Sequence, residues 1–575
     1  MHGCRSRFLR WGAFILAASL LGPSVAGLAQ DASPPSGETA ASIGRDEFRE
    51  QLRDYFGFED PQARGGRVVI GEPAEIGTVN GLLANGYPTH FVTSFLFDKL
   101  VGISPIDGKP VPQLADSWEV GADGRTFTFR LNRSARWHDG ADVTAEDVVF
   151  SFDVALGGEL PTNRWSGLRG ALASYRVVDA DTVEMTATDR LATFLYEVPA
   201  FVPIVPRHVW EPVPPAAWQD DPGSTGEDPA RVVGSGPFRF VAWQQFERVT
   251  LARNDAYYDA VPATDELVFR LLPNKDRAIE ALRAGEVDAV EGVGPTAVEA
   301  ETDAGTLRVD VFEVARMQYY AHNLDPARTP LFQDKRVRQA LFVALDRPRI
   351  INTVLEASGE LALGTQPRRS DAYAPKLVPE TYAYDPERAR ALLAEAGWVD
   401  SNGDGTVDRD GREFRFEILA NTEASGILKL LPELEQRWRE IGVAVTPKLV
   451  GFQELQERIR RHDFDMFVGF QNWDSSGNQG MLFRCDAYPD GDNAMAYCNP
   501  EYDRLDDLQR REFDPERRLA LLIQLSNLAW DDLPLGILRF LQSSAGYSTR
   551  LHNFRPDEFG RMRTFWSLQY VWVEP

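Results

Sequence analysis

Alternating apolar and polar positions predict β-strands at several places along the chain. The clearest case is Thr126–Leu131, where Phe127, Phe129 and Leu131 alternate with polar neighbours as in a strand with one buried face. Short apolar runs predict further strands at 67–70, 414–418, 443–445 and 464–470.

Apolar positions spaced three and four residues apart predict helices between these strands. Thr144 followed by Asp147 forms a capping pair at the start of one helix, and Asp385-Pro386 caps another that Gly397 ends. The other predicted helices cover 46–58, 337–345, 431–441 and 452–459. Strand and helix alternate in the second half, which predicts a parallel or mixed sheet with covering helices, the α/β fold class.

The length and composition indicate a soluble protein with more than one packing unit. A chain of 575 residues should hold about two to four such units, and 43% hydrophobic with 26% charged residues is typical of globular domains. The segment 199–237 is dense in proline and glycine, which predicts a connecting region and no core element. The sequence has no repeat of fixed period, so a solenoid or propeller is not expected.

The first 29 residues have the pattern of a secretory signal. Three arginines precede the apolar run 11–21, and small residues precede Gln30. No later stretch has about 18 uninterrupted apolar residues, so the mature protein should be free in the periplasm. Cys4 lies inside the signal and would leave with it, which disfavours a lipid anchor. Residues 30–65 are predicted to be a flexible leader with a short helix.

The two remaining cysteines, Cys485 and Cys498, are predicted to form a disulfide. In an oxidising compartment two cysteines flanking a loop rich in glycine, proline, asparagine and aspartate are most simply paired. Closing so small a loop would restrict the unfolded chain by roughly 3 kcal/mol in the entropy model.

Charge and motif searches exclude several classes of function. The net charge of −25 makes nucleic acid an improbable partner, and we interpret the acidity as a source of solubility more than of ligand steering. The sequence contains no G-x-S-x-G, H-E-x-x-H or P-loop motif, and its seven histidines are scattered. We therefore expect neither an enzyme nor a cofactor or metal site.

One loop resembles the first part of a calcium site. Residues 400–408 place oxygen ligands at alternating positions, but Gly411 stands where the closing bidentate acid would be, and a strand follows. We favour a polar turn over a calcium site, and the sequence leaves calcium binding open.

Several segments together resemble the family 5 extracellular solute-binding proteins, the peptide, dipeptide and nickel binders of bacterial ABC importers. They are 112–120, 126–131, 136–140, 144–148, 234–238, 334–347 and 498–503. The resemblance implies a type II, cluster C binding protein with two lobes, a hinge and an additional domain. It places lobe I at 66–86, 232–316 and 533–575, the additional domain at 87–231 and lobe II at 317–532.

The resemblance also implies a ligand site between the lobes. Asp474 resembles the family's aspartate that pairs with a peptide's α-amino group, a charge-assisted bond in a water-poor cleft. Trp473 could form an apolar wall beside it. Weaker candidates for the cleft are Tyr87, Tyr319, Tyr320 and Asn323. Gly477-Asn478 stand where peptide binders often have Asp-Pro, which weakens the peptide assignment.

The function implied is capture of a small-molecule or peptide ligand and its delivery to the membrane permease subunits of an ABC importer by a monomer. Three alternatives stay open from the sequence. The solute could be an opine, an oligosaccharide or another metabolite, or the protein could serve a chemoreceptor with the same ligands. A secreted hydrolase is the least favoured, because the sequence shows no recognisable catalytic nucleophile or set of metal ligands.

Overall fold

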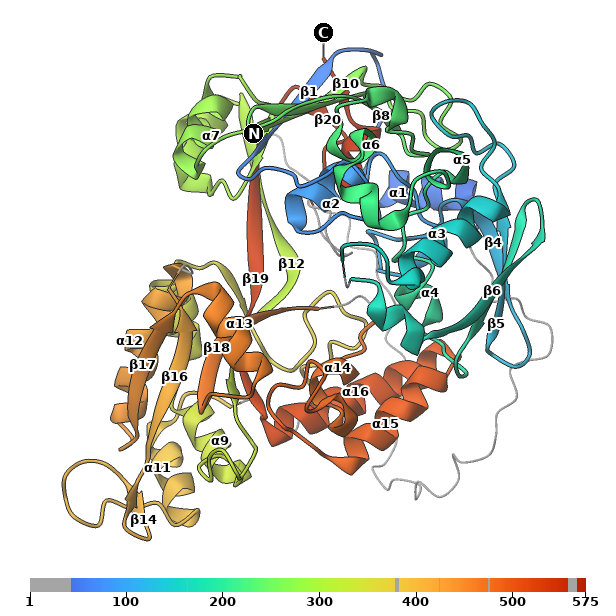
Figure 1. The fold of residues 1–575 in the computed structure, drawn as a ribbon. Coiled ribbons are helices and arrows are strands. Elements are labelled where there is room, and N and C mark those ends of the chain that lie inside the picture. The colour runs from blue at the N-terminus through green and yellow to red at the C-terminus, as the bar shows by residue number, and fades with distance from the viewer. Residues whose placement is uncertain are drawn as a thin grey trace, which may run out of the picture.

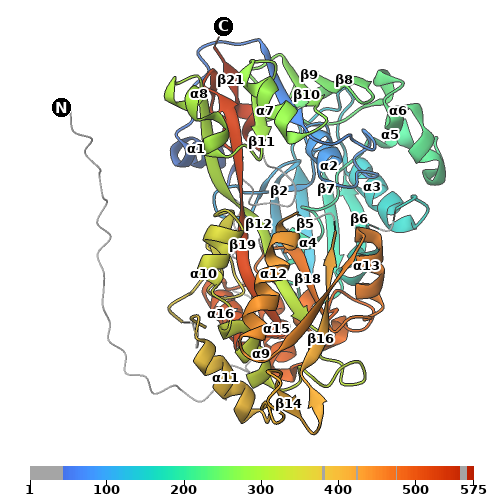
Figure 2. The ribbon, with the colours of Figure 1, turned by 90° about the vertical axis from the view of Figure 1, so that its left-hand side faces the viewer.

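The computed structural model describes residues 43–162, 164–377, 382–422, 425–473, 476–556 and 566–574. The predicted signal 1–29 and Asp474 lie outside these residues. Figure 1 shows two lobes joined by two long strands, β12 (Leu307–His322) and β19 (Leu535–Ser548), and Figure 2 shows the same connection from the side. No helix in the described ranges combines the length and apolar character needed to cross a membrane.

One mixed sheet of eleven strands runs through both lobes of the described chain. Its spatial order is β17 (Ala444–Val450), β16 (Arg415–Asn421), β18 (Met466–Asn472), β12, β19, β11 (Ala289–Glu291), β1 (Arg67–Glu72), β10 (Glu266–Leu271), β9 (Arg248–Arg253) and β8 (Phe238–Gln244), with β13 (Gly359–Leu361) paired to β19.

The antiparallel pair β12–β19 connects the lobes. Its register runs from Leu307 opposite Ser548 in lobe I to Ala321 opposite Leu535 in lobe II. The pairing is interrupted between Glu313 and Met317, at the point where the chain passes from one lobe to the other. Such an irregularity weakens the ladder locally and lets the strands bend, so we place the hinge here.

Lobe I packs strands β11, β1, β10, β9 and β8 of the large sheet against smaller sheets and short helices. A four-stranded sheet has the order β4 (Ala115–Val120), β5 (Thr126–Leu131), β7 (Thr182–Ala187), β6 (Leu172–Asp179). The small pairs are β2 (Val101–Ile103) with β3 (Pro110–Pro112) and β20 (Leu551–His552) with β21 (Trp572–Val573). The helices are α1 (Arg45–Phe56), α2 (Tyr87–Thr93), α3 (Ala145–Gly157), α4 (Phe194–Glu197), α5 (Arg207–Trp210), α6 (Pro222–Thr225), α7 (Lys275–Arg283) and α8 (Glu299–Asp303).

Lobe II surrounds the parallel strands β16, β17 and β18 with helices. These are α9 (Lys335–Val343), α10 (Arg347–Arg349), α11 (Pro386–Glu395), α12 (Ser425–Arg439), α13 (Phe452–Arg460), α14 (Gly480–Phe483), α15 (Pro500–Arg511) and α16 (Pro515–Asp532), with the hairpin β14 (Asp408–Arg409) and β15 (Arg412–Glu413). The predicted mixed α/β sheet is confirmed, because β16 is parallel to both neighbours while β12 is antiparallel.

Most predicted elements are confirmed with small shifts of their ends. Phe127, Phe129 and Leu131 are buried on one face of β5, and Thr144 with Asp147 forms the capping box of α3. The loop near the end of α14 carries the predicted disulfide between Cys485 and Cys498.

The interpretation of 199–237 as a region outside the core is wrong. Trp210 and Trp218 are buried, their rings lie 4.5 Å apart, and both belong to the core of lobe I together with Ile204. The prolines begin short helical turns that place these rings in the core. A segment without long helices or strands therefore still buries a large apolar surface.

The core of lobe I gathers residues from distant parts of the chain. It contains β1, the predicted additional domain 87–231 and the C-terminal residues Phe554 and Val571. The core of lobe II runs from Met317 to Phe540. The boundary between lobe I and an additional domain stays a prediction, because both share one continuous core.

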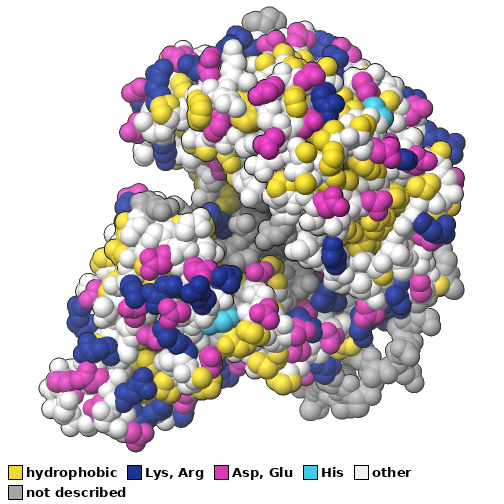
Figure 3. Space-filling model, in the orientation of Figure 1, with side chains coloured by type: hydrophobic (Ala, Val, Ile, Leu, Met, Phe, Trp, Pro, Cys, Tyr) yellow, Lys and Arg dark blue, Asp and Glu magenta, His cyan; other side chains and the backbone are white. Residues whose placement is uncertain are grey.

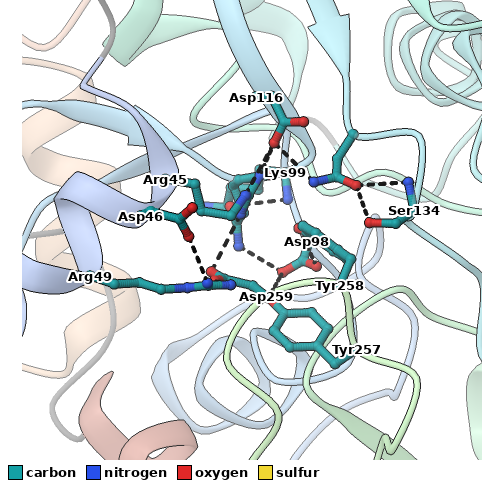
Figure 4. Close-up of polar contacts among 12 residues, drawn as sticks. Arg45, Asp46, Arg49, Asp98, Lys99, Asp116, Ser134, Tyr257, Tyr258 and Asp259 are labelled. Carbon is teal, nitrogen blue, oxygen red and sulfur yellow. Dashed lines mark hydrogen bonds and ion pairs between the residues drawn. The ribbon is translucent and has the colours of Figure 1, made fainter.

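Helix α1 is fastened to lobe I by an arginine cluster (Figure 4). Arg45 donates to Asp116 at 2.8 Å, lies 3.4 Å from Asp259, and its guanidinium lies 4.9 Å from the Tyr258 ring centroid. Arg49 pairs with the same Asp259. The Arg45 side chain is only 11% exposed, so these ion pairs are partly shielded from water.

Replacing Arg45 with alanine should weaken the attachment of α1. We expect a loss of about 2 kcal/mol in the free energy of unfolding, below the ~3–5 kcal/mol of a fully buried pair because Asp116 is 45% exposed. Arg53→Ala in the same helix is the matched control, since Arg53 is 57% exposed and such pairs contribute little. Urea unfolding of both variants measures the free energy of unfolding. Equal decreases in the two variants would contradict the role of Arg45 in attaching α1.

Candidate functional site

The carboxyl ends of the parallel strands of both lobes point toward the hinge. In lobe I, β11 ends at Glu291 beside Ala545 of β19, and β1 ends next to it at Glu72. In lobe II, β18 ends at Asn472 opposite Arg316 of β12. Open α/β sheets bind ligands outside the carboxyl ends of their strands, so the region between the lobes is the candidate site.

A cavity of about 490 Å³ lies at the hinge. It is lined by Val309–Glu313 of β12, Glu360, Arg369, Gln542 and Pro556. This volume is within the roughly 300–1,000 Å³ typical of small-molecule sites. Figure 3 shows the surface hollowed between the two lobes. The cavity therefore has room for a small solute at the place where the lobes move.

Two carboxyls from the strands that flank β19 lie close together in this cavity. Glu313 of β12 lies near Glu360 of β13, and Gln542 between them donates to Glu360 at 3.3 Å. Burial, followed by the charge and a hydrogen bond of Glu360, raises the pKa of Glu313 to about 7. Near neutral pH the pair therefore retains a proton for part of the time, and it can exchange that proton for a cationic group.

A second acidic pair, Glu72 and Glu291, lies at the carboxyl ends of β1 and β11 in lobe I. Glu72 is 7% exposed, and burial first, then the neighbouring Glu291, raises its pKa to about 8. Glu291 accepts a hydrogen bond from Ser543 Oγ at 2.9 Å. The two pairs contact consecutive residues of β19, Gln542 and Ser543, so they lie on opposite faces of this strand, and each includes one glutamate whose pKa is raised.

Trp473 is held in place by a side-chain hydrogen bond. Its Nε1 donates to Gln366 Oε1 at 2.8 Å, and Gln366 Nε2 donates to the carbonyl of Gly477 at 3.1 Å. The indole is 6% exposed and sits directly after β18, at the hinge side of lobe II. The predicted amine anchor Asp474 is the next residue and lies outside the described residues.

The other predicted site residues have different surroundings. Tyr87 is half-buried at the first residue of α2 and stacks on Phe91 at 5.8 Å. Tyr319 is 7% exposed, while Tyr320 and Asn323 are completely buried within lobe II. The Asn323 amide donates to the carbonyls of His462 and Phe464, which ties two loops together. The ligand role of these residues stays a prediction, and the burial of the last two favours structural roles.

The sequence analysis missed the four glutamates. Glu72 and Glu291 each end a short apolar strand, and a charge directly after such a run is a signal that could have been used. Glu313 and Glu360 carry no such signal, because their contact depends on how β12 and β13 are placed around β19.

The calcium-like loop forms a turn closed by its own side chains. The Asp400 carboxylate accepts hydrogen bonds from the backbone N–H of Gly403 and Gly405, at 2.7 and 3.0 Å. Ser401 Oγ donates to Asp408, where the hairpin begins. The carboxylates thus satisfy the backbone of a polar turn, the alternative that the sequence favoured.

The raised pKa of Glu72 predicts a pH-dependent stability. Above pH 4.5 the unfolded carboxyl loses its proton while the folded one keeps it to about pH 8, so stability should fall as pH rises through this window. Glu72→Gln should match the wild type at pH 5 and have the higher melting temperature at pH 8.5. Glu247→Gln, at a 62% exposed side chain, is the control. A Glu72→Gln difference that does not vary with pH would contradict the assignment.

Comparisons with known proteins agree with this architecture. Residues 109–492 match the family described as bacterial extracellular solute-binding proteins, family 5. The oligopeptide-binding protein AppA of Bacillus subtilis is 26% identical over 445 residues, covering 77% of this chain and 80% of that protein. The dipeptide-binding protein of Escherichia coli is 25% identical over 474 residues, covering 77% and 83%.

Solved structures are similar over nearly the whole chain. AppA of Bacillus subtilis in complex with a nonapeptide has a TM-score of 0.73 at 25% identity, covering 90% of this chain and all of that one. NikA of Brucella suis in complex with Fe(III)-EDTA has a TM-score of 0.75 at 20% identity, covering 88% and 100%, and this shows a shared fold. The two-lobe fold expected from the sequence motifs is confirmed, and the chain belongs to family 5 of the bacterial extracellular solute-binding proteins.

Proposed function

We propose that this protein is the periplasmic solute-binding component of an ABC importer and that it captures a peptide or peptide-like solute between its lobes. The observation that carries the proposal is the cavity at a hinge made of two continuous strands, in a chain of this family. Relatives named for oligopeptide and dipeptide binding support the class of solute.

The mechanism requires capture and presentation, with no bond made or broken. The ligand must prefer the closed arrangement of the lobes over the open one, because equal affinity for both would shift no population. Bending at the irregular pairing between Glu313 and Met317 would move the lobes while β12 and β19 stay paired on either side. A membrane permease would then recognise the closed form of a monomer.

The acidic hinge suits a solute with a cationic group. An ammonium close to Glu313 would replace the proton of this carboxyl and form a charge-assisted hydrogen bond, next to Glu360, which already pairs with Arg368 at 3.5 Å. Asp474 is proposed as the anchor of the α-amino group, and Trp473 as an apolar wall beside it. All of these side chains would lie around the positively charged end of the ligand.

The solute itself is identified by releasing it from purified protein. We expect mass spectrometry of the supernatant, after denaturing protein isolated from the periplasm, to reveal short peptides. A single non-peptide compound would overturn the peptide assignment and keep the solute-binding role. Peptide titrations by calorimetry on protein refolded without ligand test the same point independently.

Replacing Asp474 with asparagine should weaken peptide binding by about 2–5 kcal/mol, the scale for losing one partner of a buried charge pair. Asp490→Asn is the matched control, since Asp490 is exposed in the loop before α15. Calorimetry with the same peptide measures both variants. Wild-type affinity in Asp474→Asn would remove this residue from the site.

A further inference from the structure

The two lobes also meet at a place away from the connecting strands. The end of α15, in lobe II, lies against the loop before α4 in lobe I, where the Ala192 N–H donates to the Arg510 carbonyl at 2.6 Å. Figure 1 shows the end of α15 below α4 and to the right of β12 and β19. The lobes are therefore connected at two separate places, the hinge and this contact.

Phe513, in the turn between α15 and α16, packs against the core of lobe I. Its ring is half-buried beside the apolar cluster that includes Leu191 and Phe194. Arg190 Cζ lies 5.2 Å from the ring centroid, within the range of a cation–π interaction. Lobe II thus places an aromatic side chain on the surface of lobe I.

Lobe I leaves space for this ring at Gly124, in the turn between β4 and β5. A Cβ at Gly124 would lie 3.0 Å from Phe513 Cε2 and 2.9 Å from Arg190 Cγ. The glycine also has a φ of +64°, which a residue with a side chain adopts only with strain. The position that receives Phe513 therefore depends on a residue without a side chain.

Donors of lobe I satisfy the carboxyl end of α15. The last carbonyls of a helix have no donor within the helix, and α15 ends at Arg511. The Ala192 N–H donates to one of them, on Arg510. Arg190 Nε donates to the next, on Arg511, at 3.0 Å, and its positive charge is favourable at this negative end of a helix. The two lobes are thus complementary in hydrogen bonding and in charge.

An ion pair crosses the same contact. The Arg511 guanidinium pairs with Asp189, and both side chains are more than half exposed. Burial raises the pKa of Asp189, but hydrogen bonds from the Arg190 backbone N–H and from Arg511 outweigh it and lower the pKa, so the carboxylate is ionised at neutral pH. Because exposed pairs contribute little energy, this pair adds specificity to the contact more than strength.

This contact is separate from the hinge cavity. Arg369 also reaches across from lobe II, to the Pro105 carbonyl at 3.3 Å, but Arg369 lines the cavity. Phe513, Arg190 and Asp189 are not among the residues that line it. A solute in the cavity does not need to touch these three residues for them to act on the lobes.

A rotation of the lobes at the hinge acts strongly on this contact. Displacement in a rotation grows with the distance from the axis, and bending is centred on the irregular pairing between Glu313 and Met317. A hydrogen bond is lost once its donor and acceptor separate beyond about 3.5 Å. Separation of the lobes must therefore break the bonds at the end of α15.

We propose that the contacts of 124 and 189–192 with 510–513, the clasp, hold the lobes together without solute and set the fraction of molecules in which the lobes are closed. Apparent affinity is the intrinsic affinity multiplied by the fraction of the competent form, so the clasp raises affinity for a solute that it does not touch. This effect on affinity rests on the proposed solute-binding function, whereas the clasp itself is tested on protein without solute.

Hydrogen exchange at Ala192 measures the opening of the clasp, because this N–H is bonded to the other lobe. In Phe513→Ala, refolded without solute, we expect Ala192 to exchange about tenfold faster, a loss of roughly half the transfer free energy of a fully buried phenylalanine. Amides of β5 should keep the wild-type rate. Leu508→Ala is the matched control in the same helix, since Leu508 is 42% exposed. Unchanged exchange at Ala192, or equal acceleration in β5, would overturn the proposal.

The separation of the lobes is measured by pulsed electron–electron resonance between nitroxide labels at Arg176→Cys in β6 and Glu501→Cys in α15. Both side chains are more than half exposed, and Cys485 and Cys498 are paired and do not take a label. We expect one main distance in the ligand-free protein and an additional, longer distance once Phe513→Ala is introduced. A ligand-free protein with mainly the longer distance, or no change on introducing Phe513→Ala, would overturn the proposal.

Exchanging the charges tests the ion pair of the clasp. Asp189→Arg and Arg511→Asp each place like charges across the contact, and we expect each to accelerate exchange at Ala192 about twofold to fivefold, the scale of an exposed pair. The double variant restores opposite charges and should return the rate close to that of the wild type. A double variant that exchanges as fast as the faster single variant would show that the pair does not hold the lobes together.

Discussion

The pairing of β12 with β19 is the constraint on which the rest of the structure depends. These strands belong to both lobes, and every other strand of the large sheet is placed relative to them. Their irregular pairing at the hinge lies beside the cavity and both acidic pairs. A change in the angle between the lobes must therefore alter the distances among groups that could hold a solute, so binding and shape change are coupled by geometry.

Charge is distributed unevenly around this connection. Glu313, Glu360, Glu72 and Glu291 line or border the region where the strand ends meet, and burial raises the pKa of Glu313 and of Glu72. Alternation along β19 puts the Glu313–Glu360 pair on the Gln542 face and the Glu72–Glu291 pair on the Ser543 face. An acidic pair therefore lies on each side of the strand that connects the lobes.

Features set by neighbouring residues could be predicted from the sequence, and features set by distant residues could not. The capping box of α3 and the alternation in β5 are local, and both are found as expected. Trp210 and Trp218 were missed because their burial depends on tertiary packing of short turns, which a proline-rich pattern conceals. The family resemblance proposes Asp474 and Trp473 as site residues, and this stays a prediction, whereas the contact of Glu313 with Glu360 depends on the strand order.

The core of lobe I combines the early strand β1 with residues 545–573, and this has a consequence for folding during synthesis. The core of lobe I includes Ala545, Phe554 and Val573, whereas that of lobe II is complete by Phe540. During synthesis lobe I therefore cannot finish folding until the final residues appear, although its first strand emerges early. Such a chain remains incompletely folded for most of its elongation, and its two cores are completed in the reverse of the order in which their first strands emerge.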